Sequence, residues 1–174
     1  RCVTGYDLVH LCDCHGRFDM NSVLCGAEGS LAFVTQAKVK LTRVPRFSAL
    51  LNIRYDSFDA ALRDASALMK LEAASSETVD ATVLGLARQD AIWLKVREFF
   101  PDDTQGPAQG VNIVEFIAEE AAQLEDKLTR VQDALADGGA GRLGFTITRD
   151  AQAIAAIWSM RKKSVGLLGN MQGE

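Results

Sequence analysis

The sequence comprises 174 residues, 48% hydrophobic and 24% charged, with a formal net charge of −4 and an isoelectric point near 5.2. This composition is globular and provides enough apolar surface for one domain, or for one domain and part of another. The acidic balance argues against a nucleic-acid-binding protein, and no apolar run approaches the roughly 18 residues of a membrane span. The sequence opens at Arg1 without a signal-like segment and stops at Glu174 soon after a hydrophobic stretch, so we expect an internal fragment.

All four cysteines lie in the first 25 residues, at Cys2, Cys12, Cys14 and Cys25, with His15 beside Cys14. Zinc ligands usually come in pairs spaced C-x₂₋₄-C, with a second pair further along. Here one residue separates Cys12 from Cys14 and no second pair follows. The spacing favours reduced thiols of a cytosolic protein and predicts no metal ligands. A zinc-bearing interaction domain is the alternative.

A half-buried strand is predicted for residues 33–41, where apolar side chains alternate with lysine and glutamine. Pro45 then marks a boundary, because proline cannot donate to a continuing strand ladder. We therefore expect one domain to end within residues 1–44 and a second domain to occupy residues 45–174.

From Pro45 onward, strands alternate with helices. We expect Asp56-Ser57 and Asp150 to cap helices. Glu77 and Asp80, at a strand end, could approach a site there, but acids that end a strand are more often caps, and we interpret them so. The pattern predicts an α+β fold with a ferredoxin-like antiparallel sheet and its helices on one face. A parallel doubly wound sheet is the alternative, since the same alternation would serve βαβ units. The expected strands are 51–55, 75–79, 111–117 and 143–148, and the expected helices are 57–70, 83–87, 119–137 and one from 150 past 161.

A glycine-containing string precedes the first predicted strand: Leu24-Cys25-Gly26-Ala27-Glu28-Gly29-Ser30-Leu31-Ala32-Phe33-Val34-Thr35. Gly26 and Gly29 bracket a tight turn, where glycine allows positive φ and lets a ligand lie against bare backbone. Two glycines before a strand indicate, by themselves, no more than a turn.

The whole string resembles the G-S-E-G-T-L-G-I-I-T segment that closes the FAD-binding domain of flavoproteins related to vanillyl-alcohol oxidase and p-cresol methylhydroxylase. Within that group, the string most resembles the branch that contains the D-lactate, glycolate and D-2-hydroxyglutarate dehydrogenases. Upstream, Thr4-Gly5-Tyr6-Asp7-Leu8 resembles the family's G-Y-D-L. The sequence departs from the family at Cys12–Ser22, an insertion between the two motifs, and at Ala32, which replaces a glycine.

The resemblance implies that residues 1–44 are the C-terminal end of a PCMH-type FAD-binding domain, with 33–41 as its last strand. It implies that residues 45–174 form the N-terminal and central part of the substrate-binding domain. The flavin would be lined, largely through backbone atoms, by Gly5, Tyr6, Gly26, Glu28, Gly29, Ser30, Leu31, Ala32, Phe33 and Val34.

The implied activity is oxidation of a D-2-hydroxyacid, of the D-lactate or D-2-hydroxyglutarate type, by hydride transfer to FAD. The family's catalytic histidines fall after Glu174, so we expect no catalytic residue here, weak or no FAD binding, and no turnover by this chain alone. Expected partners are the small 2-hydroxyacid, the rest of the FAD domain, an electron acceptor and, through an exposed strand edge, a second copy; none is nucleic acid. We expect a cytoplasmic protein, free or peripheral at the inner face of the membrane. A ferredoxin-like binding or regulatory module without catalysis is the alternative.

Arg161 continues the apolar stripe of the last predicted helix, after Ile154, Ile157 and Trp158. Burying an arginine without a partner is costly. Three arrangements avoid this cost: the aliphatic stem carries the guanidinium out to solvent, a carboxylate of the protein pairs with the guanidinium, or the guanidinium binds a substrate carboxylate through two parallel hydrogen bonds. The Trp158-Ser159-Met160-Arg161 arrangement resembles the family's W-x-x-R, whose arginine holds that carboxylate. The resemblance thus implies that Arg161 binds substrate.

Overall fold

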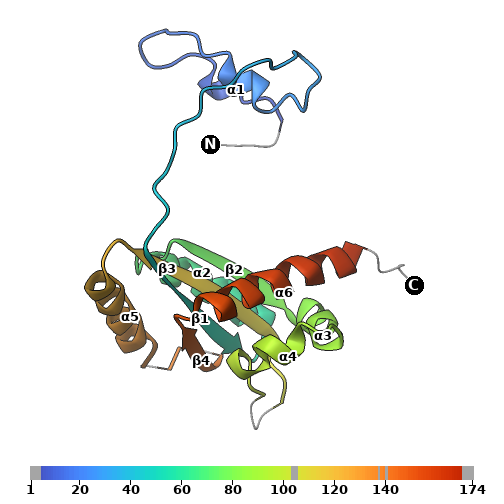
Figure 1. Cartoon of the computed structure of the whole chain (residues 1–174), viewed down its shortest axis with the longest axis vertical. Coiled ribbons are helices and arrows are strands. Elements are labelled where there is room, and N and C mark those ends of the chain that lie inside the picture. The colour runs from blue at the N-terminus through green and yellow to red at the C-terminus, as the bar shows by residue number, and fades with distance from the viewer. Residues whose placement is uncertain (1–4, 103–105, 137, 140, 170–174) are drawn as a thin grey trace. The chain divides into compact units, whose positions relative to one another are not determined.

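The computed structural model describes residues 5–102, 106–136, 138–139 and 141–169. The chain divides into two compact units, Arg1–Arg43 and Val44–Glu174. The first contains a 3₁₀ turn, η1 (Leu8–His10), and one short helix, α1 (Asn21–Leu24). All the strands of the described residues belong to the second unit (Figure 1).

The second unit is built on one four-stranded sheet, in the order β2-β3-β1-β4, with every neighbouring pair antiparallel. The predicted antiparallel sheet is therefore confirmed, and the parallel alternative is wrong. Apart from α3, α4 and η2, which lie between β2 and β3, the elements from β1 to β4 follow the order β-α-β-β-α-β, and α6 comes after them. The strands are β1 (Phe47–Tyr55), β2 (Ser75–Asp80), β3 (Gly110–Ala118) and β4 (Arg142–Thr148).

One face of the sheet is covered by α2 (Phe58–Met69) and α5 (Ala121–Ala136), as expected for these two helices. Ser57 begins α2 as predicted, because its hydroxyl accepts a hydrogen bond from the backbone N–H of Ala60. The apolar stripes of both helices pack on inward-facing strand residues. This core includes Leu51, Ile53, Val114, Phe116, Leu68, Leu124, Leu128 and Val131.

The other face is covered as well, so the prediction that helices occupy only one face is wrong. Helices α3 (Ala81–Gln89), α4 (Trp93–Val96) and α6 (Ala151–Gly169) pack there, with the 3₁₀ turn η2 (Arg97–Phe99) following α4. Figure 1 shows α6 crossing the near side of the sheet. The physical reason lies in the central strands, which are apolar on both sides and would otherwise expose Leu50, Val111 and Ile113 to water.

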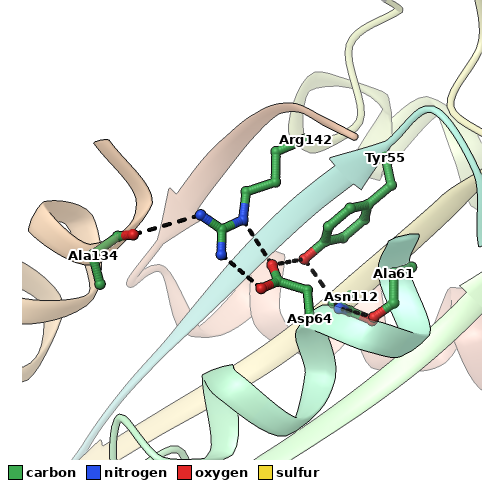
Figure 2. Close-up of polar contacts among 6 residues, drawn as sticks. All are labelled: Tyr55, Ala61, Asp64, Asn112, Ala134 and Arg142. Carbon is green, nitrogen blue, oxygen red and sulfur yellow. Dashed lines mark hydrogen bonds and ion pairs between the residues drawn. The ribbon is translucent and has the colours of Figure 1, made fainter. Parts of the chain in front are cut away.

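A buried polar network ties α2 to β4 across the first face (Figure 2). Asp64 accepts two hydrogen bonds from the Arg142 guanidinium, at 2.7 and 2.6 Å, and one from the Tyr55 hydroxyl at 2.6 Å. Asn112 donates to the Tyr55 oxygen at 3.1 Å and to the backbone carbonyl of Ala61 at 2.8 Å. Burial, followed by the hydrogen bond to Asp64, raises the pKa of Tyr55.

The predicted strand at residues 33–41 is absent, since none of these residues has strand geometry. A strand exists through hydrogen bonds to a neighbouring strand, and this alternating segment has none. The companion prediction, that the segment is not central to the sheet, is confirmed. Across the described ranges, none of the helices combines the length and apolarity that crossing a membrane requires.

Candidate functional site

The glycine string forms the tight turn that the sequence predicts. Glu28 and Gly29, at the two central positions, both have positive φ, 46° and 78°. The backbone N–H of Ser30 closes the turn by donating to the carbonyl of Ala27 at 2.8 Å. A Cβ added at Gly29 would meet no atom within 4 Å. The turn therefore presents glycine backbone to open space, where a ligand can approach closely.

The two motifs meet in spite of the insertion between them. A Cβ at Gly26 would lie 1.7 Å from the carbonyl oxygen of Gly5, so only glycine allows these backbone segments to approach so closely. The Tyr6 hydroxyl lies 3.4 Å from the Ser30 hydroxyl, which extends the contact to the turn. Gly5, Tyr6, Gly26 and Ser30 are thus brought together, as a shared binding surface requires.

The residues after the turn are exposed apolar groups. Leu31 and Val34 are largely exposed, and Phe33 is fully exposed. Together with the open backbone at Gly29, they fit one edge of a flavin, which has an apolar ring system and polar atoms that backbone N–H groups can bind.

The inserted residues fold back on themselves as a small closed loop. Cys12 pairs with Phe18 in an isolated antiparallel bridge, and Asp13 accepts hydrogen bonds from the backbone of His15 and Arg17. The bond from the Arg17 backbone is the main cause that lowers the pKa of Asp13. Within the described part of the chain, no group of three or more potential ligands could hold a metal ion, and Cys12, Cys14 and Cys25 are free and exposed.

Arg161 lies on α6, at the border of its buried stripe. Asp150 begins this helix by accepting from the N–H of Ala153 at 2.7 Å, as the sequence predicts. The stripe includes Ile154 and Ile157, as expected, but it continues through Met160 and Ser164, while Trp158 and Arg161 are half-buried. The Arg161 side chain keeps 40% of its surface exposed.

The structure pairs Arg161 with Glu77, which sequence reasoning interpreted as a helix cap. Glu77 Oε2 forms an ion pair with Arg161 Nε. Asp80 is the residue that caps α3, accepting from the N–H of Val83 at 2.8 Å. Two residues further along α6, the Lys163 Nζ atom lies 3.8 Å from Asp90 Oδ1. The signal for Glu77 in the sequence is its position two residues before the buried Val79. Residues two apart in a strand point to the same face, which places Glu77 on the face of β2 that α3 and α6 cover.

Comparison with known proteins identifies the family. Residues 44–174 match the family described as FAD linked oxidases, C-terminal domain. A D-2-hydroxyglutarate dehydrogenase of Pseudomonas putida is 50% identical over 100% of this chain, and those of Escherichia coli and Pantoea ananatis are each 42% identical over 99% of it. The chain spans 17–18% of the length of these relatives. With three quarters of its residues matched to that domain, the chain belongs to the FAD-linked oxidases.

Proposed function

We propose that the protein carrying this chain is an FAD-dependent dehydrogenase that oxidises D-2-hydroxyglutarate or a closely related D-2-hydroxyacid. The observation that carries this proposal is the 50% identity to the Pseudomonas putida D-2-hydroxyglutarate dehydrogenase over the whole chain. That identity includes the first 43 residues, outside the matched oxidase domain. A binding module without catalysis would account for residues 45–174 and would leave the glycine turn without a role.

Each unit has a distinct part in this proposal. Residues 1–44 end the FAD-binding domain, and the turn from Gly26 to Val34 lines one edge of the flavin, beside Gly5 and Tyr6. Residues 45–174 form the N-terminal and central part of the substrate domain, built on the ferredoxin-like sheet. Bound FAD would supply the redox chemistry of the reaction, as the hydride acceptor in the oxidation of the hydroxyacid at C2.

Arg161 is the residue we assign to substrate binding. Its guanidinium is a planar fork that matches a carboxylate, and its position at the border of the buried stripe leaves it accessible. Holding the C1 carboxylate there would fix the orientation of the C2 carbinol. The contribution of this chain to the reaction is therefore binding and orientation.

The proposal is tested with the purified full-length protein and an artificial electron acceptor. D-2-hydroxyglutarate should reduce the acceptor, with kcat/KM well above that for D-lactate, and its L-enantiomer should be inactive. Bound flavin is measured by absorbance before the assay. A protein that binds flavin but oxidises none of these hydroxyacids would contradict the proposed substrate class, while one without flavin would contradict the cofactor.

A further inference from the structure

Glu77 occupies an edge strand yet points onto a covered face. It lies in register with Ile113, a fully buried member of the α3–α6 core, and Val79 follows on the same side. The Oε2 atom is shielded from solvent and has no hydrogen bond among the described residues. Its ion-pair partner in that part of the chain is Arg161. Shielding a charged carboxylate oxygen from water is costly unless a cation lies beside it. The position of Glu77 Oε2 therefore depends on the guanidinium of Arg161.

The contact uses a particular edge of the arginine. Glu77 meets Nε, on the side of the guanidinium nearest the aliphatic stem. No side-chain hydrogen bond of Arg161 is found among the described residues, which leaves its two terminal nitrogens available. Those two nitrogens form the end of the fork that can bind a carboxylate through two parallel hydrogen bonds.

We propose that Glu77 is a positioning residue, which holds the Arg161 fork so that its terminal nitrogens face the substrate carboxylate. This inference rests on the proposed function and adds to it a residue that does not itself touch substrate. A free arginine side chain has many rotamers, and fixing it before binding removes an entropic cost from the complex. The ion pair is too exposed, at 40% and 34% of the two side chains, to contribute much to stability.

The test compares four variants of the full-length protein, all assayed with D-2-hydroxyglutarate: Glu77→Gln, Glu77→Ala, Arg161→Ala and the double variant Glu77→Ala/Arg161→Ala. The matched control is Glu125→Gln, the same chemical change at the exposed carboxylate that binds Arg149 through two 2.7 Å hydrogen bonds. For each variant kcat, KM, bound flavin and the melting temperature are measured.

We expect Glu77→Ala to lower kcat/KM on the order of ten- to hundredfold, with a higher KM and a lower kcat. Without Glu77, Arg161 would hold the substrate carboxylate more weakly and in the wrong orientation. Glu77→Gln should lie between Glu77→Ala and wild type, since the amide oxygen keeps a partial negative charge beside Nε while the full charge of the ion pair is lost. The double variant should be no worse than Arg161→Ala, because Glu77 acts through the arginine. Flavin content, melting temperature and the control should stay near wild type.

Three results would overturn the assignment. A lower KM at unchanged kcat in the Glu77 variants would mean that the carboxylate competes with substrate. A lower melting temperature with unchanged kcat/KM would make the pair structural. If the losses of kcat/KM in the two single variants added fully in the double variant, Glu77 would act independently of Arg161. If Arg161→Ala left turnover unchanged, both the substrate role of Arg161 and the positioning role of Glu77 would be contradicted. If Arg161→Ala lowered turnover strongly while Glu77→Ala had no effect, only the positioning role of Glu77 would be contradicted.

Discussion

At the scale of single residues, Arg161 and Arg142 show two uses of the same side chain. Arg142 is only 15% exposed and fully engaged by Asp64, so its role is to join elements. Arg161 is more exposed and has one edge of its fork in an ion pair. Geometry thus separates an arginine that serves the fold from one that remains available for a ligand.

The substrate role proposed for Arg161 predicts a specific loss of activity in Arg161→Lys. Lysine keeps the charge but loses the planar fork, so kcat/KM for the hydroxyacid should fall on the order of a hundredfold. Bound flavin should stay at the wild-type level, because Arg161 is not among the residues proposed to line the flavin. Steady-state kinetics and flavin absorbance measure both quantities. Unchanged kinetics, or loss of flavin together with activity, would count against the role.

Asp64 predicts how stability depends on pH. Burial acts to raise its pKa, but the hydrogen bonds from Arg142 and Tyr55 outweigh burial and lower the pKa below the ordinary 3.8. A lowered carboxyl pKa stabilises the fold fully above about pH 4, and this stability is lost as the pH falls through the folded-state value. Asp64→Asn removes the charge that pairs with the partly buried Arg142, and should cost about 1–2 kcal/mol at pH 7.

The check is urea unfolding of the 174-residue chain between pH 7 and pH 3. The wild-type free energy of unfolding should fall more steeply below pH 4 than that of Asp64→Asn, which lacks the titrating group. Asp59→Asn, which breaks an exposed ion pair with Arg63 on the same helix, is the control and should change little. Parallel pH profiles for wild type and Asp64→Asn would contradict the assignment.

At the scale of elements, two glycines predict opposite effects of alanine. Gly85 lies inside α3 with nothing within 4 Å of an added Cβ, so Gly85→Ala should stabilise the chain by about 0.5–1 kcal/mol. Gly110 begins β3 against α2, where a Cβ would lie 3.0 Å from that of Ala61 and 3.2 Å from the Ser57 carbonyl oxygen. Gly110→Ala should cost about 1–3 kcal/mol. Thermal unfolding of both variants would contradict this account if their shifts had the same sign.

The sequence predicted the elements of the larger unit well because local patterns specify them. The caps at Ser57 and Asp150 and the alternation in β4 are signals within a few residues. Pairing between distant residues leaves no such signal. The alternation over 33–41 is genuine but has no strand to pair with, and the second helical layer follows from the two-sided burial of β1, whose run from Ala49 to Tyr55 is buried throughout. The ion pair between Arg161 and Glu77 likewise joins residues far apart in the sequence, so only the three-dimensional structure reveals it.

At the scale of the whole molecule, the division into two units predicts where a protease cuts. Lys38 and Lys40 are exposed and lie outside any helix or strand, in the last residues of the first unit. Brief trypsin digestion should cleave there first and leave a resistant product that contains the sheet. Mass spectrometry of the products checks the order of cleavage. Early cuts within β1 or α5 would contradict it.

The strand order has a consequence for how the chain is made. β1 lies in the middle of the sheet, yet both of its neighbours, β3 and β4, come much later in the sequence. During synthesis at roughly 5–20 residues per second, roughly 5 to 20 seconds separate the appearance of Tyr55 from that of Thr148. Throughout that interval the apolar run of β1 lacks at least one neighbour. We therefore expect the apolar face of β1 to need transient cover, by α2 or by a chaperone, until β4 leaves the ribosome.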